Sequence, residues 1–152
     1  MKKKNVIAIL TVIIFAVAAA IILGIIFIER PAFENVEKDK IVSVSYFINY
    51  YDNEKPVYLS LPEENIDELL SLMHDIKIKG FGTNDRGDYT GGTYFMFKIQ
   101  LNNGKQIEFS AENPHMQING KYYDTEYEQA NALYEFWRGF VDTGRKEYGL
   151  AG

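Results

Sequence analysis

The chain has 152 residues, of which 47% are hydrophobic, 14% aromatic and 24% charged, and its net charge is −5. This length accommodates one ordinary domain, and the aromatic content argues against a disordered chain. Because the sequence contains no cysteine, disulfides, thiolate nucleophiles and cysteine-ligated metal centres are excluded.

The N-terminal segment carries the strongest signal. Residues 6–28 hold no charged side chain, and a helix of that length crosses the hydrocarbon core of a bilayer, which is roughly 30 Å thick. Residues 1–5 form a basic leader, and lysines at such a position stay in the cytoplasm. We therefore expect a single-pass signal anchor in the cell membrane, with the C-terminal part outside the cytoplasm. The alternative, a cleaved signal peptide, fits less well because apolar residues continue past Ala18–Ala20.

Small residues line one face of this predicted membrane helix. Ala16, Ala20 and Gly24 are spaced four apart, and small side chains at that spacing allow a second helix to approach closely. They are candidate residues for helix packing within the membrane.

The charge outside the membrane segment restricts the possible partners. After residue 28 the chain carries 13 basic and 21 acidic residues, a net charge of −8. This disfavours binding to nucleic acid or to anionic lipid headgroups. The bilayer around residues 6–28 and a protein of the membrane or envelope remain as expected partners.

The remaining sequence predicts a linker at 29–40, one α+β domain at 41–143 and a tail at 144–152. Alternation of apolar residues predicts strands at 41–51 and 93–101, among others. In the first of these the expected apolar face holds Val42, Val44, Tyr46, Ile48 and Tyr50.

Two Asn-Gly pairs, at 103–104 and 119–120, predict the tight turns of an antiparallel meander. Helical spacing predicts one helix over 62–75 and another from about Thr125 to 142, with capping boxes beginning at Ser60 and Thr125 and a stop at Gly144. We expect a mostly antiparallel sheet of five to six strands, with the two helices packed on one of its faces.

The glycine-rich loop at 80–92 is the most unusual stretch of the domain. Its backbone and polar side chains could surround a ligand, although a flexible connection is the alternative. The candidate ligand-binding residues here and just beyond are Asn84, Asp85, Arg86, Asp88, Tyr89 and Tyr94. The loop has neither the GK[ST] ending of a phosphate loop nor calcium-loop spacing, so no cofactor or metal is predicted.

No catalytic motif accompanies the two histidines, His74 and His115, which we expect at the surface or at a helix end. The layout resembles small anchored proteins of the bacterial cell envelope, in architecture alone. The leading hypothesis is an extracytoplasmic domain that binds another protein or an envelope ligand, and its many tyrosines suit such a surface. Two alternatives stay open: an envelope hydrolase with paired carboxylates, and a structural subunit of a membrane complex.

Overall fold

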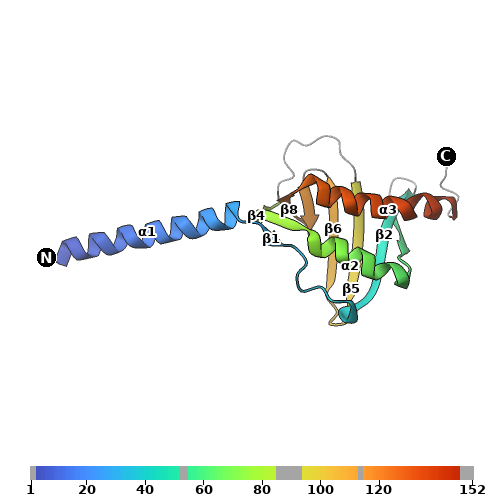
Figure 1. Ribbon diagram of the computed structural model, residues 1–152, viewed down its shortest axis with the longest axis horizontal. Coiled ribbons are helices and arrows are strands. Elements are labelled where there is room, and N and C mark those ends of the chain that lie inside the picture. The colour runs from blue at the N-terminus through green and yellow to red at the C-terminus, as the bar shows by residue number, and fades with distance from the viewer. Residues whose placement is uncertain (1–2, 52–54, 85–93, 113–114, 148–152) are drawn as a thin grey trace.

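A computed structural model of the chain describes residues 3–51, 55–84, 94–112 and 115–147. A long N-terminal helix projects from an α+β domain (Figure 1). The helices are α1 (Lys3–Phe27), α2 (Ile66–Asp75) and α3 (Tyr127–Glu147), with short 3-10 turns η1 (Lys38–Lys40) and η2 (Glu63–Asn65). The strands are β1 (Arg30–Pro31), β2 (Ile41–Tyr51), β3 (Lys55–Ser60), β4 (Lys77–Thr83), β5 (Tyr94–Leu101), β6 (Gln106–Glu112), β7 (His115–Ile118) and β8 (Lys121–Thr125).

All eight strands form one antiparallel sheet in the order β1-β4-β8-β7-β6-β5-β2-β3. The predicted fold class and the meander from β5 to β8 are confirmed, whereas the predicted count of five to six strands is too low. The turn between β7 and β8 has positive φ at Asn119 and Gly120, as expected for an Asn-Gly hairpin.

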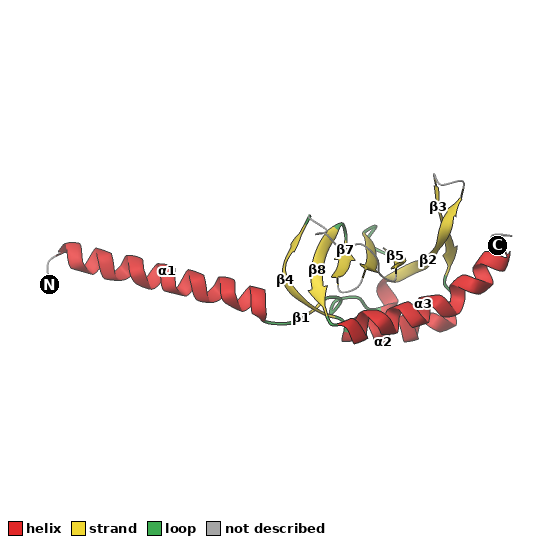
Figure 2. Cartoon of the chain, turned by 90° about the horizontal axis from the view of Figure 1, so that it is seen from above, coloured by secondary structure: helices red, strands yellow, loops and turns green. Residues whose placement is uncertain are grey.

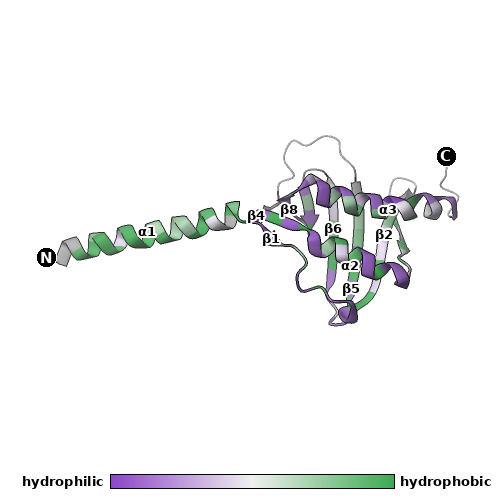
Figure 3. Cartoon of the chain, viewed as in Figure 1, coloured by the Kyte–Doolittle hydropathy of each residue, from purple (hydrophilic) through white to green (hydrophobic). Residues whose placement is uncertain are grey.

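The core lies between the sheet and a layer formed by α2 and α3, which run side by side on one face (Figure 2). Both helices show polar residues outward, whereas α1 is apolar along its length (Figure 3). The fully buried side chains include Leu69, Met73, Phe95, Phe97, Phe109 and Leu133. The alternation in the strands and the helical spacing thus meet in one apolar layer, as predicted.

One predicted face of β2 is wrong at Val42. Ile41 pairs with Leu101 while Ser43 pairs with Gln100, so two steps along β2 match one step along β5. This bulge turns the Val42 side chain outward, where it is 64% exposed. Val44 continues the buried face as expected.

A second irregularity lies between Phe47 and Asn49, and both Phe47 and Ile48 are buried. A bulge takes backbone groups out of the regular ladder, and buried carbonyls need partners. Helix α3 supplies them: Trp137 Nε1 donates to the Phe47 carbonyl at 2.6 Å, and Arg145 Nε donates to the Ile48 carbonyl at 2.9 Å.

The residues predicted as a linker are packed against the domain. β1 pairs with β4, and the side chains of Phe33 and Val36 are buried in the core. His74, in the last turn of α2, places its Nε2 2.8 Å from the Val36 carbonyl oxygen. The chain therefore passes from α1 into the sheet within a few residues.

Both predicted capping boxes are wrong. Ser60 is the last residue of β3, and η2 follows it without a side-chain cap. Thr125 ends β8, and its hydroxyl donates to the Lys77 carbonyl of β4 at 2.9 Å. The local sequence pattern predicted Ser60 and Thr125 at the starts of helices, but both residues belong to paired strands.

Gly144 does not end α3, which continues to Glu147. A Cβ at Gly144 would lie 2.5 Å from Leu59 Cδ1 and 3.3 Å from Ile48 Cγ2. The glycine therefore permits close approach of the helix to β2 and β3.

We expect Gly144→Ala to lower the free energy of unfolding by about 1–3 kcal/mol, because Leu59 and Ile48 must move. Gly139→Ala is the matched control: nothing lies within 4 Å of its added Cβ, and it should gain about 0.5–1 kcal/mol of helix propensity. Urea unfolding of the full chain in detergent measures both variants. Equal stabilisation by the two substitutions would contradict the packing of α3 described above.

Candidate functional site

The face of the sheet turned away from α2 and α3 is the candidate site, and we call it the open face. The sheet bends so that both of its ends rise away from the helices, which makes this face concave (Figure 2). None of the described helices covers it. Its side chains alternate along the strands with those of the core, and they include Tyr58, Met96, Lys98, Glu108, Ser110, His115, Gln117, Tyr122 and Asp124.

A group that we call the aromatic–cation cluster lies at the β3 side of the open face. It consists of Phe47, Tyr58, Met96, Lys98 and Glu108, from four adjacent strands. The rings of Phe47 and Tyr58 meet edge to face with centroids 5.9 Å apart, and the Tyr58 hydroxyl lies 2.7 Å from Met96 Sδ. Lys98 Nζ lies 4.1 Å from the centroid of the Tyr58 ring and 3.1 Å from Glu108 Oε2.

The charge of Lys98 is held in place by these neighbours. Burial is the largest single influence and lowers the pKa of Lys98, but the hydrogen bonds and charges of Tyr58 and Glu108 together outweigh it. The net effect raises the pKa of Lys98 above its ordinary value of 10.5. The cluster thus presents a fixed ammonium group beside an aromatic ring.

The β8 side of the open face carries hydrogen-bonding groups. His115 Nδ1 lies 2.9 Å from Asp124 Oδ1, and the buried Ser110 hydroxyl lies 3.5 Å from Gln117 Oε1. The half-buried Tyr122 pairs with Gln117 across β7 and β8. This half can orient a polar ligand through side chains already fixed by their neighbours.

On the open face, the carboxylates of Glu108 and Asp124 each have a basic side chain as a neighbour. A glycosidase-type mechanism needs two carboxyl groups, one to donate a proton and one to attack or to activate water. Here Glu108 lies against Lys98, and Asp124 lies against His115. Within the described residues, no group of three or more His, Asp or Glu side chains is placed to hold a metal ion.

The structure tests little of the predicted ligand site. Asn84 is exposed just after β4, and Tyr94 begins β5, with β8, β7 and β6 between these strands. Asp85, Arg86, Asp88 and Tyr89 lie outside the described residues. The ligand site therefore stays a prediction.

The predicted helix-packing residues Ala16, Ala20 and Gly24 all lie in α1. Nothing in a single chain tests whether a second helix packs there, so this also stays a prediction.

Sequence reasoning missed the aromatic–cation cluster. Tyr58, Lys98 and Glu108 lie on three different strands, and only the cross-strand register brings them together. The sequence held one signal for this cluster: within its own strand, each residue alternates with core residues and therefore points to the face opposite the core. The Asn-Gly signal at 103–104 already indicated the hairpin that pairs Lys98 with Glu108. The contact of Tyr58 with Lys98 depends instead on the pairing of β2 with both β3 and β5, and the alternation does not give that register.

A second concave region lies beside the segment that follows β1. This cleft of about 440 Å³ is bounded by residues 31–36 and by the turns around Asn103 and Asn119. Lys40 reaches the cleft, and its Nζ pairs with Glu37 Oε2 at 3.0 Å. The lining of this cleft mixes apolar, polar and charged side chains, and it indicates no class of ligand as clearly as the aromatic–cation cluster does.

Comparison with known proteins supplies no family: no protein-family model, no curated protein and no solved structure matches the chain. The functional argument therefore rests on the geometry of this chain alone.

Lys98→Met should destabilise the domain by about 1 kcal/mol near neutral pH, because it removes the ion pair and the cation–π contact. A raised pKa in the folded state gives stability that is present below the unfolded pKa of 10.5 and is lost as the pH rises through the folded pKa. The stability difference between wild type and variant should therefore shrink above that pH. Urea unfolding across the alkaline range measures it, and a gap independent of pH would contradict the assignment.

Proposed function

We propose that this chain is a single-pass membrane protein whose domain lies outside the cytoplasm and binds another protein through the open face. The observation that carries the proposal is the concave sheet face, left uncovered by α2 and α3 and furnished with tyrosines, a methionine and fixed charges. On this face Ser110 is also buried, to 3% exposure, although serine is mostly found exposed.

The membrane part of the proposal is supported by α1. This helix is long and apolar enough to cross a membrane, and none of the stretch from Val6 to Gly24 is buried against the rest of the chain. The lysines before it favour a cytoplasmic N-terminus.

The chemistry of the open face favours a protein ligand. Tyr58 and Tyr122 are half-buried and offer rigid aromatic area with a polar tip, and Met96 can adapt its shape to a partner. The ammonium of Lys98 and the carboxylate of Asp124 lie at opposite sides of this surface. A polypeptide segment can complement this surface, because its apolar side chains can pack on the aromatic rings and its charged side chains can pair with the ammonium and the carboxylate.

Site-specific photocrosslinking tests the binding face. A benzoylphenylalanine residue replaces Tyr58 or Tyr122 in the full chain, and crosslinks are formed in native membranes and identified by mass spectrometry. The matched control is Tyr127, an exposed tyrosine on α3 with 58% exposure. We expect one protein to crosslink at Tyr58 and Tyr122 but not at Tyr127, and Lys98→Glu to diminish the product. Equal labelling at all three positions, or none at the open face, would refute this binding face.

A helix exchange separates the domain from the membrane segment. Replacing residues 6–24 with an unrelated membrane helix should leave the open-face crosslink intact. Loss of the product would instead place recognition in α1 and favour the helix-packing residues Ala16, Ala20 and Gly24.

A further inference from the structure

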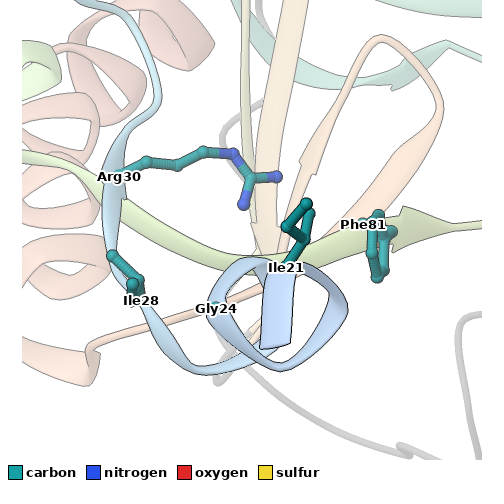
Figure 4. Close-up of a pocket in the computed structure, with 5 residues that line it drawn as sticks. All are labelled: Ile21, Gly24, Ile28, Arg30 and Phe81. Carbon is teal, nitrogen blue, oxygen red and sulfur yellow. The ribbon is translucent and has the colours of Figure 1, made fainter. Parts of the chain in front are cut away.

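An apolar groove runs between the end of α1 and β4. Its lining consists of Ile21, Gly24, Ile28, Phe81 and Arg30, and its volume is about 500 Å³ (Figure 4). The arginine side chain extends from β1 across the end of α1, while Phe81 stands on β4 beside the helix (Figure 4). Apart from this arginine, the side chains of the described residues that line the groove are aliphatic or aromatic.

The junction beside the groove is tied by several contacts. Arg30 Nη2 donates to the Gly80 carbonyl at 2.5 Å, and the guanidinium lies 5.8 Å from the centroid of the Tyr123 ring. Lys79 Nζ lies 2.9 Å from Glu29 Oε1. The hydrogen bond and charge of Lys79 lower the pKa of Glu29, and those of Glu29 raise the pKa of Lys79. Together with the pairing of β1 and β4, these contacts hold the domain against the end of α1.

Phe81 is an aromatic side chain left 54% exposed at the edge of the sheet. It lies beside the last two turns of α1, where the apolar sequence ends. In a membrane helix this level corresponds to the boundary between hydrocarbon and headgroups, where exposed aromatic and apolar side chains are favoured.

We propose that β4 docks on the membrane surface, with Phe81 inserted at the interface and an acyl chain of a membrane phospholipid filling the groove. This inference rests on the proposed function only in requiring that α1 crosses the membrane. Three features favour this occupant: the lining is largely apolar, the groove continues the exposed surface of Ile21 on α1 and of Ile28 just after it, and the junction contacts keep Phe81 at that height.

The absence of native cysteine permits a direct test with single labels. Full-length Phe81→Cys carries an NBD fluorophore and is reconstituted into phosphatidylcholine vesicles. Quenching by acyl-brominated phosphatidylcholine reports lipid contact, and quenching by iodide reports water. Val17→Cys, equally exposed at 54% within α1, is the membrane control, and Val42→Cys, on the distant strand β2, is the aqueous control. We expect position 81 to follow position 17, with strong quenching by bromolipid and little by iodide.

The other outcomes separate the two proposals. Iodide quenching at position 81 with bromolipid quenching at position 17 would overturn membrane docking and leave the anchor standing. Iodide quenching at both positions would overturn the anchor and with it the proposed function. Protection of position 81 from both quenchers would show a protein occupant, such as a second copy of the chain, and would overturn the lipid assignment.

Discussion

The contact of Phe97 with its aromatic neighbours organises the domain. Its ring stacks on Phe109 of the adjacent strand at 5.4 Å, meets Phe95 at 5.9 Å and reaches Phe136 of α3 at 6.1 Å between centroids. Each fully buried aromatic of this kind contributes about 1.5–3 kcal/mol relative to exposure. Because these rings all lie on one side of the sheet, both α2 and α3 are drawn to that side. The other side is consequently free to carry polar and half-buried side chains, and the candidate binding surface follows from this one-sided burial.

The two faces are nevertheless coupled through β2. At its second irregularity the Phe47 side chain faces Tyr58 on the open face, while the Phe47 carbonyl accepts a hydrogen bond from Trp137 in the helical layer. The neighbouring carbonyl of Ile48 is held by Arg145. Helix α3 thus stabilises the backbone shape that positions the aromatic–cation cluster. A substitution of Trp137 in the core layer would therefore alter the backbone at Phe47 and with it the aromatic–cation cluster, although Trp137 itself does not lie on the open face.

How far the sequence predicts this structure depends on the range of the interaction. The strands predicted from alternation at 41–51 and 93–101, the Asn-Gly turn at 119–120 and the two amphipathic helices are local patterns, and the structure has β2, β5, this turn, α2 and α3 in those places. The failures are non-local. Val42 is turned outward by a bulge in the pairing of β2 with β5. The Thr125 hydroxyl donates a hydrogen bond to a carbonyl of β4 instead of capping a helix. The aromatic–cation cluster belongs to the same class, since cross-strand register alone assembles it. The predicted ligand loop cannot be judged in the same way, because most of it lies outside the described residues.

The proposed docking of β4 gives the open face a definite direction. From β4 the strands succeed one another away from α1 toward β3, and the open face is turned sideways to the axis of that helix (Figure 2). With α1 across the membrane, this face looks along the membrane surface rather than away from it. A flexible linker would have let the domain meet ligands from any side, but the contacts of Arg30 and Lys79 remove that freedom. A fixed sideways face loses less orientational freedom when it binds a neighbour that is itself held in the same membrane. Taken together, the two proposals therefore favour a membrane-bound partner that stands beside this chain over a ligand that arrives from solution.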